Sequence, residues 1–256
     1  MPKNDEFEAR RRSRQREIKR KRRKRNFMVF CFFLVVTLVV LCFTVFFKVE
    51  TVKVTGSDIY SEEQISSASG ITGQNMFRLS TSRVEDKIRE TLPYVDSVKI
   101  NRKIPHTVKL TVEDAAPYSY YINNGKCYIA SKKGYVLEES SAGANELIRI
   151  ECSKVVCNVG KKITIVSKKE QKLVDELLTV LEDRGIPITA IDVRNPAAIK
   201  INVGNRFEIN LGTKDYLTKK IAHLKGMLGS IEPDKKGTID LSMWTPENSQ
   251  GSFIKK

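Results

Sequence analysis

The chain has 256 residues and a formal net charge of +15. The excess lies mostly at the start, since residues 1–25 hold 13 Lys/Arg against 4 Asp/Glu, while the rest of the chain is close to balanced. An evenly basic chain would favour nucleic-acid binding. Charge confined to one short segment does not, so no nucleic-acid partner is expected.

An uncharged run follows the basic segment directly. From residue 27 to residue 47 only Thr37 and Thr44 are polar. At about 1.5 Å per residue, a helix of this length spans roughly 30 Å, the thickness of the bilayer hydrocarbon. A cleaved signal peptide has a shorter apolar core and a small-residue cleavage site, and FFKVETV offers neither. The run therefore predicts one transmembrane helix over 27–47.

The orientation of this helix follows from the flanking charges. The stretch RRSRQREIKRKRRKR precedes the run, whereas only Lys48, Glu50 and Lys53 lie close behind it. Positive flanks stay on the cytoplasmic side. The sequence thus predicts a cytoplasmic tail over 1–26 and an extracytoplasmic remainder. The tail is expected to set topology and to attract anionic lipid head groups; contact with a protein or nucleic acid is the alternative.

Residues 48–115 show the pattern of a small α/β domain. VETVKVTG predicts a strand, and Ser61 with Gln64 fits a capping box that starts a short helix ended by Gly70. A second helix is indicated by apolar residues four apart, and Pro93 ends it. Two alternating segments then predict two strands. The predicted order is β-α-α-β-β, and these patterns rest on Val84, Ile88, Leu92, Val98, Ile100, Val108, Leu110 and Val112.

Residues 116–243 read as a mixed, β-rich domain with two packing helices. Seven short segments have strand character, from YSYYI to FEINLG, and helices are expected over about 168–184 and 214–228. The leucine-rich stripes of both helices are assigned to the core. GTIDLSMW alternates and predicts a last strand, and residues 244–256 are expected to be a flexible tail. The fold class is α+β behind a single N-terminal transmembrane helix.

The order of these segments resembles the FtsQ/DivIB family of bacterial cell-division proteins. The resemblance covers nearly the whole chain and implies that residues 48–115 form a POTRA-type domain. The chain departs from the family pattern at two positions. The family usually has arginine at the position of Asp114 and often has arginine at the position of Ser242. The segments that carry the resemblance are VETVKVTG, GITGQNMFRLSTSRV, LPYVDSVKINRKIPHTVKLTVED, FEINLG and GTIDLS.

The resemblance implies a non-catalytic scaffold at the division septum that helps to regulate septal wall synthesis. In the family, the last strand of the β domain receives a segment of the coiled-coil proteins of the FtsL and FtsB/DivIC type. An edge strand offers unpaired backbone groups to such a segment. Carried over by position, partner binding by strand addition is expected at Thr238, Ile239, Asp240, Leu241, Ser242, Met243 and Trp244.

Two points about binding stay open in the sequence. Trp244, the single tryptophan, suits an interface anchor and a core residue equally well. The first domain also offers a strand edge through 52–54 or through 108–112, unless these strands simply complete the sheet. Two alternative functions are another POTRA-bearing envelope protein for secretion or assembly, and a membrane-anchored cell-wall-binding protein.

The residues show no catalytic, cofactor or metal signature. No Walker-type phosphate loop and no G-x-S-x-G elbow occur. His106 and His223 have no ligand-like spacing to the cysteines. Of the three cysteines after the membrane run, Cys152 and Cys157 are close enough to pair across a hairpin, and their pairing is left open.

Overall fold

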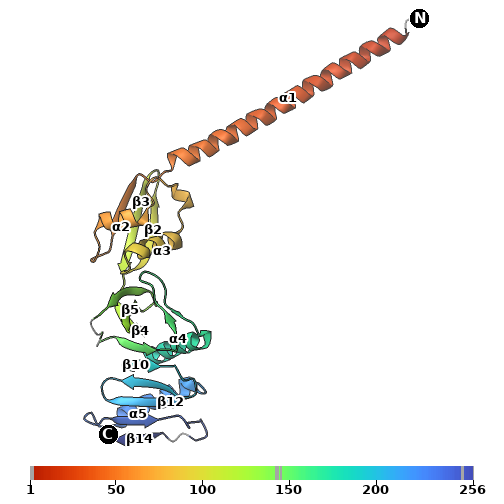
Figure 1. Cartoon of the computed structure of the whole chain (residues 1–256). Helices are drawn as coiled ribbons and strands as arrows, with labels where there is room; N and C mark the ends of the chain where they lie inside the picture. The colour runs from red at the N-terminus through yellow and green to blue at the C-terminus, as the bar shows by residue number, and fades with distance from the viewer. Residues whose placement is uncertain (1–2, 142–143, 145, 249–250, 256) are drawn as a thin grey trace. The chain divides into compact units, whose positions relative to one another are not determined.

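The computed structural model describes residues 3–141, 144, 146–248 and 251–255. Helix α1, Lys3–Phe46, continues from the basic tail through the apolar run (Figure 1). Within the described residues, one segment, Lys24–Phe46, is long and apolar enough to cross a membrane. The basic side chains of the tail are expected to meet anionic lipids. Up to residue 21 these side chains lie outside the described part of the structure.

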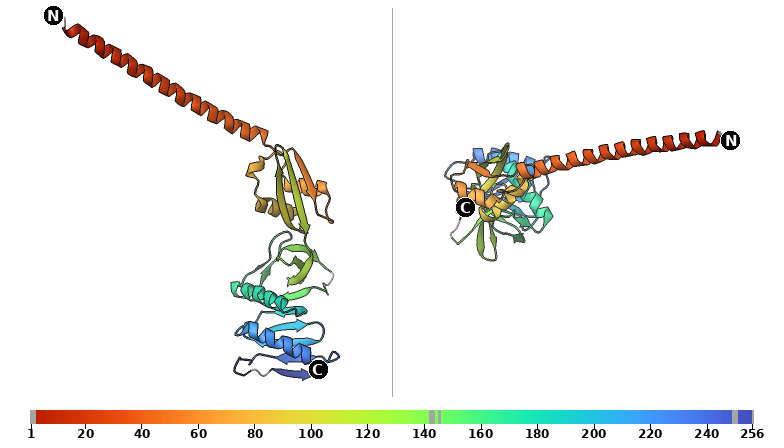
Figure 2. Two further views of the ribbon diagram at one scale, coloured as in Figure 1. Left: turned by 180° about the vertical axis from the view of Figure 1, so that it is seen from behind. Right: turned by 90° about the horizontal axis from the view of Figure 1, so that it is seen from above.

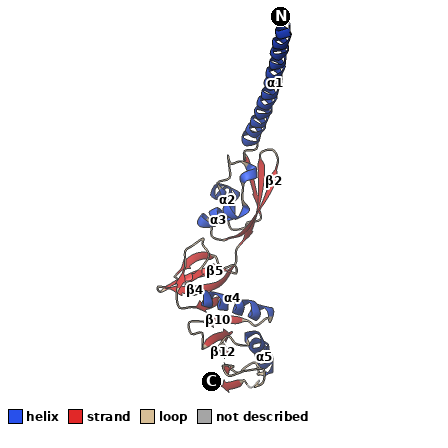
Figure 3. Cartoon of the chain, turned by 90° about the vertical axis from the view of Figure 1, so that its right-hand side faces the viewer, coloured by secondary structure: helices blue, strands red, loops and turns tan. Residues whose placement is uncertain are grey.

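A three-stranded sheet with two helices on one face follows α1 (Figure 3). The β-α-α-β-β order agrees with the sequence, apart from an added 3-10 turn η1. Strand order is β1-β3-β2, so β3 is central. The elements are β1 Thr51–Thr55, α2 Glu62–Ser69, η1 Met76–Arg78, α3 Thr81–Thr91, β2 Val95–Lys103 and β3 Thr107–Asp114.

Local chemistry explains both helices. The Ser61 hydroxyl accepts from the Gln64 N–H, the Gln64 side chain accepts from the Ser61 N–H, and Gly70 ends α2 in the left-handed region. In α3, Val84 and Ile88 are buried at helical spacing. The capping box and the apolar stripe are thus confirmed.

A nine-stranded sheet makes up most of the remaining chain. Its order is β14-β13-β12-β11-β10-β7-β4-β5-β6, which mixes parallel and antiparallel pairs. Its strands are β4 Pro117–Asn123, β5 Lys126–Ser131, β6 Val136–Ser140, β7 Ile148–Glu151, β10 Ile188–Asp192, β11 Ile199–Val203, β12 Phe207–Gly212, β13 Gly237–Asp240 and β14 Ser252–Lys255.

Helices α4 and α5 cover the same face of this sheet (Figure 2, left). The helices are α4 Lys168–Asp183 and α5 Leu217–Ser230. A separate two-stranded sheet of β8 Val155–Val156 and β9 Thr164–Ile165 packs into the same core. The apolar stripes of both helices point into the main core, as expected; their fully buried members include Leu177, Leu181, Ile221 and Leu224.

The chain divides into two compact units, and the strands of the three-stranded sheet run through both. In the smaller unit, the Asn75 side-chain amide donates to the Phe43 carbonyl at the end of α1 over 2.8 Å. The Phe47 ring lies 5.1 Å from the Phe77 ring. The units are Met1–Lys53, Ile71–Leu79 and Asn101–Lys109 in one, and Val54–Gly70, Ser80–Ile100 and Leu110–Lys256 in the other.

Candidate partner interface

The strand predicted to receive a partner is β13, near one end of the nine-stranded sheet. It pairs in parallel with β12, and Ile209 lies opposite Ile239. Arg206 shapes the loop that leads into it, because its guanidinium donates to the Glu232 carbonyl at 2.8 Å and to the Lys235 carbonyl at 3.2 Å. The chain therefore enters β13 from a loop held by charge-assisted hydrogen bonds.

The predicted site residues divide into a buried and an accessible set. Ile239 and Leu241 are fully buried, and Trp244 is 7% exposed within the main core. Thr238, Asp240 and Ser242 are partly exposed. The side chains of the buried set support the strand, so direct side-chain contact with a partner is left to the others.

Met243 is the most exposed of the predicted residues, at 82%. It was expected to continue the alternation of Ile239 and Leu241, but the strand ends at Asp240. There the Asp240 carboxylate accepts the Ser242 N–H at 2.8 Å, a short turn that redirects the chain. The side chain of Met243 therefore faces solvent instead of continuing the core face.

A strand that the sequence analysis missed lies beside β13. Residues from 244 onward were expected to be flexible, yet Ser252–Lys255 forms β14, antiparallel to β13. Phe253 lies opposite Ile239 and packs against Phe207, with the ring centres 6.2 Å apart. Ile254 is 61% exposed. The order of the sheet ends at β14, which makes β14 the edge strand in place of β13.

Gly237 allows the close approach of β14. A Cβ at this position would lie 2.2 Å from the Ile254 carbonyl oxygen and 2.7 Å from the Phe253 ring. Contacts under 3 Å are not tolerated, so any larger residue would push the neighbouring strand away. The glycine is a second signal, beside the apolar pair Phe253–Ile254, from which β14 could have been found.

A cleft of about 620 Å³ lies at this end of the sheet. Next to it, Trp244 packs 5.7 Å from the His223 ring, and its indole N–H has no acceptor among the described residues. A buried donor without an acceptor is unusual. The cleft is lined by His223, Met227, Asp240, Ser242, Met243, Asn248, Gly251 and Ser252.

Below β12, a buried lysine fixes α5 to the sheet. Lys220 is 1% exposed, and its ammonium donates to the Leu211 carbonyl at 2.6 Å and to the Thr213 carbonyl at 3.1 Å. Burial lowers the pKa of Lys220, while Asp215 opposes this shift. The strand beneath the candidate site is thus anchored by polar bonds as well as by packing.

The second candidate edge, in the three-stranded sheet, is only partly available. The suggestion that residues 108–112 offer an edge is wrong, because β3 lies between β1 and β2. Residues 52–54 lie in β1, which is an outer strand. Whether a partner uses β1 stays a prediction.

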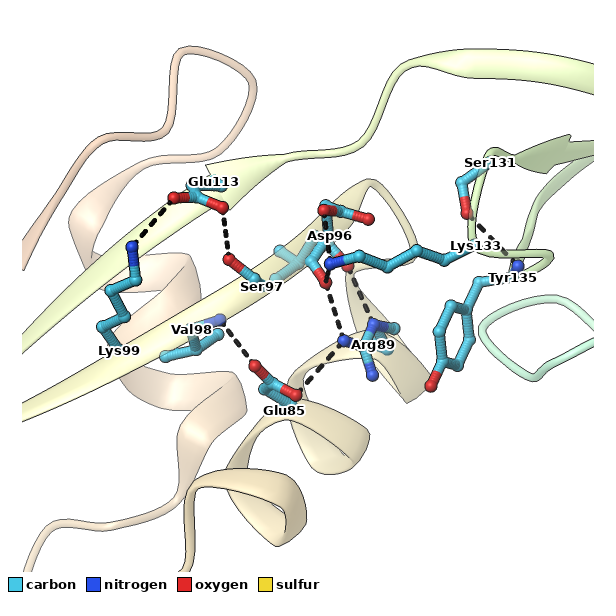
Figure 4. Close-up of polar contacts among 11 residues, drawn as sticks. Glu85, Arg89, Asp96, Ser97, Val98, Lys99, Glu113, Ser131, Lys133 and Tyr135 are labelled. Atoms are coloured by element: carbon cyan, nitrogen blue, oxygen red, sulfur yellow. Dashed lines mark hydrogen bonds and ion pairs between the residues drawn. The ribbon is translucent and has the colours of Figure 1, made fainter. Parts of the chain in front are cut away.

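The opposite end of the nine-stranded sheet is tied to α3. Arg89 is 2% exposed; its guanidinium donates to the carbonyls of Val95 at 2.9 Å and Asp96 at 2.8 Å (Figure 4). The same group lies 4.1 Å over the Tyr135 ring, and Lys133 pairs with Asp96 at 2.7 Å. The buried hydrogen bonds of Arg89 thus join α3 to β2, and the end of the nine-stranded sheet is attached to these two elements by the cation–π contact of Tyr135 and by the Lys133–Asp96 ion pair.

The cysteines and histidines form no reactive cluster in the described residues. Cys127, Cys152 and Cys157 are free thiols. Burial raises the pKa of both Cys152 and Cys157 to about 11, which disfavours the thiolate at neutral pH. No group of three metal-binding side chains occurs within the described ranges.

Comparison with known proteins agrees with this architecture. The family model described as "POTRA domain, FtsQ-type" matches residues 47–114. The cell division protein DivIB of Clostridium botulinum (strain Hall) is 28% identical over 232 residues, covering 88% of this chain and 90% of the relative. DivIB of Clostridium acetobutylicum is 27% identical, covering 80% and 84%. Cell division protein FtsQ of Chloroflexus aurantiacus is 24% identical over half of each chain.

The matched POTRA segment coincides with the three-stranded sheet and its two helices. The alignment with DivIB covers 88% of this chain and therefore reaches well into the nine-stranded sheet. An apolar helix, an FtsQ-type POTRA domain and a large mixed sheet occur in the order expected from the sequence. The chain is thus similar to the DivIB and FtsQ cell-division proteins, to DivIB along most of its length, and its residues 47–114 match the FtsQ-type POTRA domain.

Proposed function

We propose that this protein is a non-catalytic scaffold of the bacterial cell-division machinery. It is held in the plasma membrane by α1 with its N-terminus in the cytoplasm, and its folded part works outside the membrane at the septum. It binds proteins of the FtsL and FtsB/DivIC type there and thereby helps to regulate septal wall synthesis. The similarity to DivIB and FtsQ proteins and the one apolar helix found among the described residues support this proposal.

The observation that carries the binding function is the C-terminal end of the nine-stranded sheet. This end combines a short edge strand, the exposed Met243 and the adjacent cleft. A partner segment gains main-chain hydrogen bonds from such an edge and side-chain specificity from the cleft. Confinement to one membrane raises the effective concentration of the partners, so even modest contacts hold a complex.

Capture of the partners from detergent extracts tests this assignment. Met243→Lys places a charge on a side chain that supports no core, so the fold should be kept. Val166→Lys is the matched control, since Val166 is also exposed, at 55%, and lies after β9. We expect Met243→Lys to reduce capture of the FtsL- and DivIC-type proteins about tenfold, with the control unchanged. Equal capture by both variants would remove the site from this end of the sheet.

Orientation and location are tested in cells. Protease added to intact, wall-stripped cells should digest the chain after residue 47 and leave the basic tail protected. A fluorescently tagged full-length copy should collect at midcell during division. A protected folded part would contradict the orientation, and uniform membrane signal in dividing cells would contradict the septal role.

A further inference from the structure

The position that a partner strand would take on β13 is filled by the protein itself. β14 runs antiparallel to β13 over four residue pairs, from Gly237 opposite Lys255 to Asp240 opposite Ser252. Only one further strand, β12, borders β13. A segment that adds directly to β13 therefore meets an occupied edge.

We propose that β14 is a built-in competitor, and that an extended segment of a membrane-anchored partner displaces it and pairs with β13 in its place. This inference rests on the proposed function and makes it more specific. In the free protein, β14 covers the backbone groups of β13, and in the complex the partner strand does. Partner binding and the pairing of β14 with β13 are then mutually exclusive.

The contacts of β14 are few enough for such an exchange. Phe253 is its only side chain packed against the main core, while Ser252, Ile254 and Lys255 are exposed. By contrast, β12 alternates buried and partly buried residues and pairs on both sides. A four-residue edge strand with one anchoring side chain is at the low-stability end of a fold.

The space left by β14 indicates what the partner segment carries. The position opposite Ile239 requires an aromatic or large apolar side chain, because the Phe253 ring packs edge-on against Phe207 there. The position opposite Thr238 points outward, as Ile254 does, and places little demand on side-chain type. The backbone must pass close to Gly237. The partner is thus an extended segment with one aromatic or large apolar anchor.

A reversible disulfide across the two strands tests the exchange. Thr238 and Ile254 are directly opposite and both accessible, so Thr238→Cys with Ile254→Cys can be joined in the full-length protein. We expect the oxidised form to capture the FtsL- and DivIC-type proteins at least tenfold less than the reduced form. The two variants that carry only one of these introduced cysteines are the controls, and their capture should not respond to oxidation. Equal capture by oxidised and reduced forms would overturn the proposal.

A chain that ends at Asn248 tests the same point in the opposite direction, because it lacks the competitor. We expect it to bind the partners more tightly than the intact chain. It should also bind a synthetic peptide of residues 251–255, GSFIK, while the intact chain binds this peptide weakly and the Phe253→Ala peptide binds to neither. Partner affinity equal to that of the intact chain would overturn the proposal.

Partner capture distinguishes a failure of the proposed function from a failure of the β14 displacement. If no variant captures the partners, the proposed function is wrong, and the displacement of β14 by such a partner is wrong with it. If the partners are captured regardless of the disulfide, only the displacement is wrong. Gly237→Ala separates the cases further, since its Cβ conflicts with any strand that follows the path of β14: it should weaken partner capture even though β14 is released. If Gly237→Ala captured the partners as strongly as the chain ending at Asn248, the partner strand would not follow the path of β14.

Discussion

The two ends of the nine-stranded sheet solve the same problem with different chemistry. An edge strand exposes unpaired backbone groups, and proteins usually cover or charge it. At the β6 end, Val136 exchanges hydrogen bonds with Gly160 and Lys161, and the exposed Glu138 and Glu139 follow. At the β14 end, the last strand carries the exposed apolar Ile254 and no acidic residue.

The difference indicates which edge strand stays paired in the sheet and which can be released. The β6 end contacts α3 and β2: Tyr135 lies under the buried Arg89 guanidinium, and Lys133 pairs with Asp96 (Figure 4). Gly160 also approaches the Arg89 carbonyl closely. The β14 end has one aromatic anchor, Phe253. We therefore expect changes at the β6 end to affect the stability of the fold, and changes at the β14 end to affect mainly binding.

Two glycines give the sharpest contrast between the ends. At Gly160 a Cβ would lie 2.3 Å from the Arg89 carbonyl oxygen, and the φ of 78° is in the left-handed region. Gly160→Ala should lower the free energy of unfolding by about 2–4 kcal/mol. Gly237→Ala should lower it by less than about 1 kcal/mol, because only β14 is displaced. Urea unfolding of both variants measures this, and equal losses would remove the distinction.

Arg89 should contribute a comparable amount to the stability of the fold, because it joins α3 to β2 and also contacts Tyr135 before β6. Arg89→Met keeps much of the side-chain volume but removes the bonds to the Val95 and Asp96 carbonyls. The two buried acceptors would lose their donors, which costs about 2–4 kcal/mol. Denaturant unfolding checks the size, and Lys99→Met, at an exposed ion pair with Glu113, is the control that should be near neutral. A loss under about 0.5 kcal/mol for Arg89→Met would contradict the account.

A substitution at Lys220 tests whether the pairing of β14 depends on the hydrogen bonds that hold α5 to the end of β12. Lys220→Met leaves the Leu211 and Thr213 carbonyls without their donor and should cost about 1–3 kcal/mol. The hydrogen exchange of β14 relative to β12 should stay the same. Selective loss of protection in β14 in this variant would show that the pairing of β14 depends on the Lys220 hydrogen bonds.

The same lysine predicts a pH effect. Burial lowers its pKa in the folded state, so the penalty for the buried charge is fully present below that lowered pKa. As pH rises from there to the ordinary value near 10.5, the folded state loses its proton first, and stability increases. Unfolding measured from pH 8 to 11 should show this gain in the parent and not in Lys220→Met. An identical pH profile in both proteins would contradict the buried charge.

Within β14, two neighbouring substitutions should separate anchoring from exposure. Phe253→Ala removes the one packed side chain and should release the strand, at a cost of about 1 kcal/mol or less, since Phe253 is only partly buried. Ile254→Ala removes an exposed side chain and should leave stability and exchange unchanged. Amide exchange of residues 252–255 reports both, and equal protection in the two variants would contradict the anchor.

The smallest effect is expected for thiol labelling of Cys152 and Cys157, which lie in the sequence between β7 and β9. With a pKa of about 11 for Cys152 and Cys157, neither thiol should react with a maleimide at pH 7 in the folded protein, and both should react after denaturation. Mass spectrometry of the labelled protein measures this. Rapid labelling of the native protein would show that the centre of the sheet opens more easily than its edges.

Local sequence signals predicted most helices and strands of this fold, but not η1, β8, β9 or β14, and not which strands lie side by side. The Ser61–Gln64 capping box and the Val84–Ile88 spacing depend on contacts within a few residues, so they could be read directly. The central place of β3 and the order of the nine strands depend on pairing between distant segments, which periodicity does not encode.

The strand on which the candidate site rests could be predicted, whereas the strand that pairs with it was missed; the site itself stays a prediction. The alternation through Ile239 and Leu241 located β13, and both residues are buried as that pattern requires. β14 has four residues and no alternation of its own, and it is stabilised by pairing with β13 and by one aromatic contact. The sequence signals for such a strand are therefore weak, and only Gly237 and the apolar pair Phe253–Ile254 point to it.

Amide hydrogen exchange of the full-length protein in lipid nanodiscs, with and without the FtsL- and DivIC-type proteins, tests the central claim most directly. The account predicts that partner binding leaves β13 protected while residues 252–255 of β14 lose protection, because one strand has replaced another. Binding that leaves β14 as protected as in the free protein would contradict it.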